Sequence, residues 1–456
     1  MKIKTSFALV AQLACVFGVS ACDDDDSRTT SDGGPDGGGA DVTVSACPSV
    51  GTGSLAVVVA GLPAGVAAVG SATGPDGVPK PLTATATLAV PAGLYAITAA
   101  RVVVPDPRVR SVYDGVAAPT SVCVPNGGMG NAALNYAMIP TSNKLWVGTT
   151  GEGVSFAGFA SATLAASGSP AATVAANTNG SGGFAFDRDG NVWIVGGTTA
   201  DPPLARFRAN TLGTGGNKTP DVTLTSAAFT AGSPGAKDAA FDGAGNLWVT
   251  TGAARKIVKF TPAQLAAGGT AVPSVEISGL AGLESLAFDG SGNLWAGYSE
   301  GLGFVSAAAL AASRMGVEFT LDAQSGPPVI GSFGTPDGLA FDAAGNLWGA
   351  FGVRLVKLTA ADLAIPAGGA TEKVVTPAVV LDVGVLSLPK GIAFDEGQGL
   401  WMAGSQGKFI RIAPAQLATS GAATADVVVT SPSIGYAASV GIYPAPAASP
   451  LYHRLP

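Results

Sequence analysis

Ionisable side chains recur at one position in the second half of the chain, four residues before the aromatic residue of a repeated motif. That position holds Lys237, Glu284, Asp337 and Lys390 in four successive copies, and Gly182 in the copy before them. Carboxylate oxygens are ligands for hard cations such as calcium. Two ammonium groups beside two carboxylates can instead neutralise them and repel a cation. The four residues therefore predict either a polar-ligand or weak calcium site, or a set of structural ion pairs.

A second set of carboxylates directly follows the same aromatic residue. Its members are Asp187, Asp242, Asp289, Asp342 and Asp395. They could form a metal-binding array, but each one opens a short Gly-containing segment between two apolar runs. Asp in this context accepts hydrogen bonds from nearby backbone amides, and Gly supplies a left-handed residue. We expect these five residues to shape turns.

The composition excludes several classes of function. The protein has one histidine, His453, which is too few for most zinc sites and for a serine or cysteine hydrolase with a histidine base in its core. Charged residues are 12% of the 456 positions, about half the ~25% of an average soluble protein. With 24 Lys and Arg against 31 Asp and Glu, the net charge is -7, so no nucleic-acid surface is expected. No set of catalytic residues is evident, and a divalent cation is the one cofactor left open.

The motif that carries these residues occurs six times, and each copy ends in one of the six tryptophans of the protein. Five copies are FAFDRDGNVW (184–193), AAFDGAGNLW (239–248), LAFDGSGNLW (286–295), LAFDAAGNLW (339–348) and IAFDEGQGLW (392–401), while the first, MIPTSNKLW (138–146), is degenerate. Each is an apolar strand, a tight turn and a second apolar strand. A third strand, a short helical turn and a fourth strand follow. The turn carries a recurring leucine, at Leu164, Leu212, Leu265, Leu310, Leu363 and Leu417.

Four strands in each of six repeats predict an all-β fold with a six-bladed β-propeller over residues 138–456. A stacked solenoid is the alternative. The first copy lacks an inner strand of its own, so we expect residues 438–444 to pair beside residues 144–148 and close blade one. Closure would remove an open sheet edge. We expect the tryptophans to fill the space between blades, since stacking on a carbohydrate would require exposed rings.

The N-terminus predicts export. Lys2 and Lys4 precede an apolar run over 7–19, which is typical of a secretory signal and too short for a lasting membrane span. The run ends in Val19-Ser20-Ala21-Cys22, which resembles the bacterial lipobox. We therefore expect a lipoprotein signal peptide over 1–21 and lipid on Cys22. An ordinary cleaved signal peptide is the alternative, and Cys15 is a weaker lipidation candidate.

Residues 22–46 are rich in Asp, Gly and Ser, a composition that predicts a disordered tether between the anchor and the folded part. If Cys15 leaves with the signal and Cys22 takes lipid, then Cys47 and Cys123 remain. In an exported chain two remaining cysteines suggest one disulfide. A pair of buried free thiols is the alternative. The expected location is the periplasmic face, the outer membrane or the cell surface.

Residues 47–137 carry alternating apolar segments separated by Gly and Pro turns, which predict a small β-sandwich. The phrases GLPAGV and VPAGLYAIT, with a last strand near AALNYA, resemble immunoglobulin-like or carboxypeptidase-regulatory-like modules of bacterial surface proteins. We assign this part a spacer or docking role.

The repeats resemble NHL-repeat propellers and, by the phrase PDGLAFD (336–342), the wider group of regucalcin, gluconolactonases and streptogramin lyase. In regucalcin-like lactonases the position four before the aromatic supplies Glu, Asn and Asp ligands to one divalent metal at the mouth of the channel. Glu284 and Asp337 match that position by residue type, whereas Lys237 and Lys390 depart from it. Streptogramin lyase requires a histidine base, and His453 lies beyond the last expected strand.

Three hypotheses for the function follow. The first is a membrane-anchored extracytoplasmic lipoprotein whose propeller is a non-enzymatic module binding a protein or small molecule. The alternative implied by the resemblance is a metal-assisted lactonase or hydrolase using Glu284 and Asp337, with the two lysines stabilising an oxyanion. A third is a purely structural surface protein.

Overall fold

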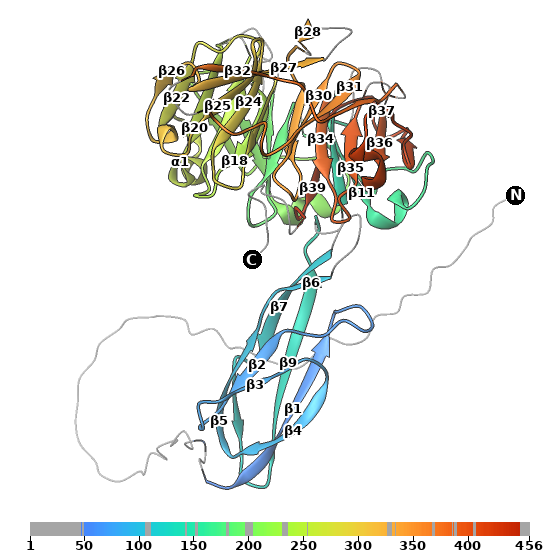
Figure 1. Cartoon of the computed structure of the whole chain (residues 1–456). Coiled ribbons are helices and arrows are strands. Elements are labelled where there is room, and N and C mark those ends of the chain that lie inside the picture. The colour runs from blue at the N-terminus through green and yellow to red at the C-terminus, as the bar shows by residue number, and fades with distance from the viewer. Residues whose placement is uncertain are drawn as a thin grey trace, which may run out of the picture. The chain divides into compact units, whose positions relative to one another are not determined.

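The structure is a computed structural model of the chain (Figure 1). It describes residues 47, 50–104, 111–141, 144–150, 154–178, 182–196, 204–229, 236–252, 254–325, 331–332, 334–366, 370–384, 386, 390–404 and 407–446. The predictions for residues 1–46, including lipidation of Cys22, and the position of His453 lie outside this range. The described part is an all-β fold that contains a β-propeller. None of its helices has the length and apolar character needed to cross a bilayer.

Residues 52–138 form two sheets over one core. The first has the order β4 (Ala86–Pro91), β1 (Thr52–Ala60), β9 (Met129–Met138), β7 (Ser111–Ala118) and β6 (Val102–Val104); the second has the order β3 (Pro79–Pro81), β2 (Gly70–Thr73), β5 (Gly93–Ala99) and β8 (Ser121–Val124). The inward residues of the alternating pattern, such as Leu55, Tyr95 and Leu134, are buried together.

A disulfide joins Cys47 to Cys123, which lies on β8. The disulfide prediction is confirmed, and the alternative of two free thiols is wrong. The bridge ties the segment that precedes β1 to one edge of the second sheet.

Among the described residues from Lys144 to Tyr443 lie six further sheets, which we call sheets one to six in the order of their tryptophans. Sheet one has the order β39 (Tyr436–Tyr443), β10 (Lys144–Thr150), β11 (Phe156–Ala160), β12 (Val174–Asn177) and β16 (Gly216–Asn217). Sheet two has the order β13 (Phe184–Phe186), β14 (Val192–Val195), β15 (Leu204–Phe207), β17 (Val222–Thr225) and β21 (Gly269–Thr270). Sheet three has the order β18 (Ala236–Phe241), β19 (Leu247–Thr251), β20 (Lys256–Phe260), β22 (Val275–Ser278) and β26 (Arg314–Met315).

The other three sheets repeat this arrangement. Sheet four has the order β23 (Ser285–Phe288), β24 (Leu294–Tyr298), β25 (Gly301–Val305), β27 (Phe319–Ser325) and β28 (Gly331–Ser332), with β32 (Glu372–Val375) also on β27. Sheet five has the order β29 (Gly338–Phe341), β30 (Leu347–Phe351), β31 (Arg354–Leu358), β33 (Val379–Asp382) and β37 (Gly421–Ala422). Sheet six has the order β34 (Lys390–Phe394), β35 (Leu400–Ala403), β36 (Lys408–Ile412) and β38 (Val427–Thr430).

The innermost strands touch one another in a closed cycle, in the order β39, β13, β18, β23, β29, β34 and back to β39. The C-terminal strand closes the cycle as predicted: β39 pairs antiparallel with β10, with Tyr443 opposite Lys144 and Ser439 opposite Gly148. Strand β39 spans Tyr436–Tyr443, so it begins two residues before the expected segment and ends before Pro444. A stacked solenoid would leave its two ends apart, and this alternative is wrong.

Short parallel pairs also connect each sheet to the next at the outer edge. In sheets one to five the fourth strand pairs with a segment that follows the helical turn of the next sheet: β16, β21, β26, β32 or β37. The sixth junction uses the same contact, because Gly168 of sheet one pairs in parallel with Val429 on β38. The ring is therefore closed at its inner and its outer edge.

Local sequence explains these elements. The helical turns are η1 (Ser161–Leu164), η2 (Ala209–Gly213), α1 (Pro262–Ala267), η3 (Ala309–Ala311) and η4 (Pro414–Ala418). In α1 the side chains of Thr261 and Gln264 form a reciprocal capping box, which satisfies amides that a short helix leaves free. The recurring leucine is buried in each of these turns, and Leu363 is half-buried. All six tryptophans are 0% to 1% exposed, so the prediction of core packing is confirmed.

Candidate functional site

The repeated aspartates shape the hairpin turns, as predicted. Asp242 accepts hydrogen bonds from the backbone N–H groups of Ala244 and Asn246, each at 3.0 Å. Its Oδ2 also accepts from the amide of Asn246 at 2.8 Å and from Nε1 of Trp248 at 2.9 Å. Gly245 has a φ of 83°, which glycine adopts at little cost. Each carboxylate is occupied by its own hairpin, so these residues are not a metal-binding array.

The hairpin of sheet six holds its aspartate differently. Gly399 stands where the other turns have Asn, and a Cβ there would lie 2.2 Å from a guanidinium nitrogen of Arg411. Nε of Arg411 donates to Asp395 at 2.5 Å. Another guanidinium nitrogen donates to Asp426 at 2.5 Å. Asp395 is 0% exposed and also accepts from Nε1 of Trp401 at 3.0 Å. Arg411 thus fills the space of the missing asparagine.

The degenerate first hairpin lacks a carboxylate. Pro140 stands in place of the aspartate, and its carbonyl accepts a hydrogen bond from the buried Nζ of Lys144. Desolvation lowers the pKa of Lys144. The indole nitrogen of Trp146 and the hydroxyl of Thr141 are buried and find no hydrogen-bond partner among the residues that the structure describes. Packing holds this tryptophan instead, since its ring stacks on Phe156 at 4.6 Å between centroids.

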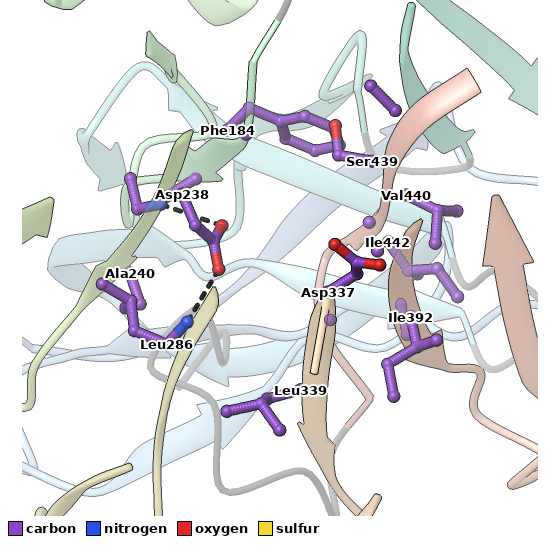
Figure 2. A pocket seen from close by; sticks show the side chains of 18 of the residues that line it. Phe184, Asp238, Ala240, Leu286, Asp337, Leu339, Ile392, Ser439, Val440 and Ile442 are labelled. Carbon is purple, nitrogen blue, oxygen red and sulfur yellow. Dashed lines mark hydrogen bonds between the residues drawn. The ribbon is translucent and has the colours of Figure 1, made fainter. Parts of the chain in front are cut away.

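A cavity of about 130 Å³ lies between the innermost strands. Figure 2 shows the carboxyl groups of Asp238 and Asp337 directed into it from two sides. Much of its wall is apolar, from Phe184, Leu286, Leu339, Ile392 and Val440. Lys237, Glu284 and Asp337 line it as well, whereas Lys390 reaches it only through its contact with Asp337.

The four predicted mouth residues form two ion pairs between neighbouring sheets. Nζ of Lys237 on β18 donates to Glu284, which directly precedes β23. Nζ of Lys390 on β34 donates to Asp337, which directly precedes β29, at 2.5 Å. The lysine side chains are 32% and 30% exposed, so water screens both pairs and each adds roughly 1 kcal/mol or less.

This pairing argues against a metal centre at Glu284 and Asp337. Among the described residues no group of three or more His, Cys, Asp or Glu side chains could hold a metal ion. Each carboxylate that matches the lactonase position has a lysine beside it, and an ammonium group disfavours a cation at the same oxygen.

A second ring of residues lies one position further along the inner strands, and sequence reasoning missed it. By register its members are Ser439, Gly183, Asp238, Ser285, Gly338 and Gly391. The glycines occur where strands approach closely. A Cβ on Gly338 would lie 2.9 Å from Cα of Gly391, and one on Gly391 would lie 2.7 Å from Cα of Ser439. The two serines donate to carbonyls of the next sheet, Gly182 at 3.2 Å and Pro336 at 2.7 Å.

Asp238 is the exception in this ring, because its side chain is ionisable. The register of β18 shifts between Ala236 and Ala239, so Lys237 and Asp238 lie in a β-bulge. Its Oδ1 accepts from the N–H of Ala239 and its Oδ2 from the N–H of Leu286 on β23, both at 2.9 Å. Burial raises the pKa of Asp238 to about 7, against the effect of these two hydrogen bonds, and the charge of Glu284 raises it further. The residue type was visible in the sequence, but the bulge was not.

Comparisons with known proteins give no family. No family model matches the chain, and no curated protein matches it. Three similar solved structures are a streptogramin B lyase, one described as a gluconolactonase, and a PQQ-bound aldose sugar dehydrogenase from Streptomyces coelicolor. Their identities to this chain are 16%, 20% and 18%, with TM-scores of 0.29, 0.32 and 0.37.

The alignments cover only part of each chain. They include 52%, 48% and 58% of this chain, and 66%, 69% and 88% of the other chains. This chain thus spans slightly less than two thirds of the streptogramin B lyase. At these identities and TM-scores the likeness says nothing of activity, and the propeller assignment rests on the sheets and their closed cycle.

Proposed function

We propose that this protein is a membrane-anchored extracytoplasmic lipoprotein whose propeller is a non-enzymatic binding module with its ligand site in the central cavity. The observation that carries the proposal is the pairing of Lys237 with Glu284 and of Lys390 with Asp337. It leaves a shaped, largely apolar cavity with polar groups at its rim, which is typical of a small-molecule site. The lactonase alternative needs those carboxylates for a metal.

The proposed organisation follows the sequence boundaries. Residues 1–21 are the signal peptide, and 22–46 are a tether from the lipid on Cys22. Residues 47–137 are a β-sandwich that acts as a spacer. Residues 138–456 form one ring in which the six sheets are the blades. The anchor would hold the module at the periplasmic face, the outer membrane or the cell surface.

The anchor is tested by fractionating bacterial cells that express the full chain. Cys22→Ser is expected to move the protein from the membrane to the soluble fraction and to abolish labelling with a radioactive fatty acid. The matched control is Cys15→Ser, which should leave both properties unchanged. Membrane retention of Cys22→Ser would contradict lipidation at this residue.

Ligand binding in the cavity is tested with a photoreactive amino acid in whole cells. Ala438 lines the cavity, whereas Val272 is 81% exposed outside it. Photolysis with the reactive group at position 438 should give a discrete adduct by mass spectrometry, and the same group at 272 should not. Equal labelling at both positions would contradict a site in the cavity.

The enzyme alternative is tested on the same preparation. The binding proposal expects no hydrolysis of lactones or esters and no metal-dependent rise in the melting temperature. A rise with calcium, magnesium, manganese or zinc that disappears in Glu284→Gln and Asp337→Asn would favour the metal-assisted hydrolase instead. A ligand at 100 times its Kd stabilises by about 2.7 kcal/mol, which a melt detects easily.

A further inference from the structure

The charges around the cavity do not balance. Lys237 is bound to Glu284, and Lys390 is bound to Asp337. Asp238 supplies a third carboxylate, and within the described part of the chain its partners are two backbone N–H groups and no cation. Neutral donors orient a carboxylate but leave its charge in place. The cavity therefore carries one excess negative charge when Asp238 is ionised.

The carboxylate of Asp238 has room for another donor. Each of its oxygens accepts one backbone hydrogen bond, and a carboxylate oxygen can accept two. The side chain is directed into the cavity (Figure 2). An ionised group in such surroundings is costly unless a cation pairs with it.

The other residues that line the cavity indicate which kind of cation it can bind. Phe184, Leu286 and Ile392 offer apolar surface around the cavity that the carboxylate enters, and an aromatic face attracts a cation. A metal ion prefers several oxygen ligands, and the described residues offer no such group. The volume of about 130 Å³ exceeds the ~10–15 Å³ that one water molecule needs on the same measure. A short alkyl chain carrying an ammonium group matches both the charge and the wall.

We propose that the central cavity binds a small primary ammonium compound with a short apolar chain, whose ammonium group pairs with Asp238. The inference rests on the proposed binding function and names the chemistry of its ligand. The ammonium group donates to the free lone pairs of the carboxylate, and the chain lies against Phe184, Leu286 and Ile392.

Calorimetric titration of the full chain at pH 8 tests this class of ligand. The probes are butylammonium chloride, the neutral 1-butanol, sodium butyrate and potassium chloride. Butylammonium should bind the wild type at least tenfold more tightly than any other probe. In Asp238→Asn its affinity should fall at least tenfold. The control Asp382→Asn removes an equal charge from an exposed position on β33, and it should bind as the wild type does.

A second variant guards against misfolding of Asp238→Asn. Ile392→Trp should fill the cavity without touching the carboxylate partners of Asp238, and it should abolish binding while circular dichroism stays unchanged. Equal binding of 1-butanol or butyrate would overturn the ammonium assignment. So would equal binding of potassium, unchanged affinity in Asp238→Asn, or no binding of butylammonium to the wild type. The photolabelling at position 438 does not depend on ligand charge, so it judges the proposed binding function separately.

Discussion

Two carboxylates inside the propeller are held in opposite ways. Asp395 in the hairpin of sheet six is fully buried and is paired with Arg411, which also binds Asp426. Asp238 beside the cavity has only backbone donors among the described residues. The first is complete within the chain and serves the fold. The second has free lone pairs and no cation paired with it in the described part of the chain, which is why we place the ligand there.

Removing Arg411, the cation that pairs with Asp395, should have the largest effect on stability. Arg411→Met is expected to lower the free energy of unfolding by about 3–5 kcal/mol, because it leaves Asp395 as an unpaired buried charge. Urea unfolding measures the loss. The control is Lys259→Met, which changes the residue opposite Trp248 at the equivalent place in sheet three. Lys259 is part-buried, its Nζ donates to the carbonyl of Leu310 at 3.1 Å, and no carboxylate of the described residues pairs with it, so its change should cost about 1 kcal/mol. Equal losses would show that Asp395 does not depend on Arg411.

The carboxyl group of Asp238 should make the stability of the protein depend on pH. The pKa of Asp238 is raised to about 7 in the folded protein from 3.8, so between these values the folded state holds a proton that the unfolded state has released. Stability from this group therefore falls as pH rises from about 4 to about 7, and it is constant above. Between pH 4.5 and 7.5 the wild type should lose about 2–4 kcal/mol more than Asp238→Asn.

Urea unfolding at several pH values checks this expectation. The exposed carboxylate variant Asp382→Asn should keep the wild-type slope. If Asp238→Asn also kept that slope, the carboxyl of Asp238 would not be the titrating group, and the contrast with Asp395 would fail.

A third substitution measures how much a turn carboxylate adds to stability when its side-chain partner is asparagine and not arginine. Asp242→Ala removes the acceptor for Asn246 and for the buried indole of Trp248, and it should cost about 1–3 kcal/mol. Gly243→Ala in the same turn adds a methyl group that meets nothing within 4 Å, so it should change stability little. In sheet one the indole of Trp146 has no hydrogen-bond partner within the described ranges, which places the expected cost below that of Arg411→Met. If Asp242→Ala cost more stability than Arg411→Met, this expected order would be wrong.

The smallest expected effect concerns Gln398, which occupies a left-handed position with φ 60° where the other four complete hairpins have glycine. Gln398→Gly relieves that conformation but loses the hydrogen bond to the N–H of Ala343. We expect a change in unfolding free energy of less than about 1 kcal/mol, measured by urea unfolding. A large loss would mean that the contact between sheets five and six matters more than the turn conformation.

The repeated units of this protein follow from its local sequence. Strand, turn and strand follow from the alternation of apolar residues and from Asp and Gly at fixed offsets, and these preferences act within about ten residues. The unpaired first hairpin and the apolar C-terminal segment identified the closing strand. The two cysteines that remain after the predicted signal peptide and lipidation site predicted the disulfide.

Which distant side chains meet depends on how the inner strands pack against one another. The spacing brought Lys237, Glu284, Asp337 and Lys390 to one rim, but only the packing of neighbouring inner strands shows that they bind one another in pairs. The bulge next to Asp238 and the space left by Gly399 for Arg411 depend on contacts between strands. A sequence pattern records spacing along one strand, whereas the charge balance of a site is set by side chains from several strands at once.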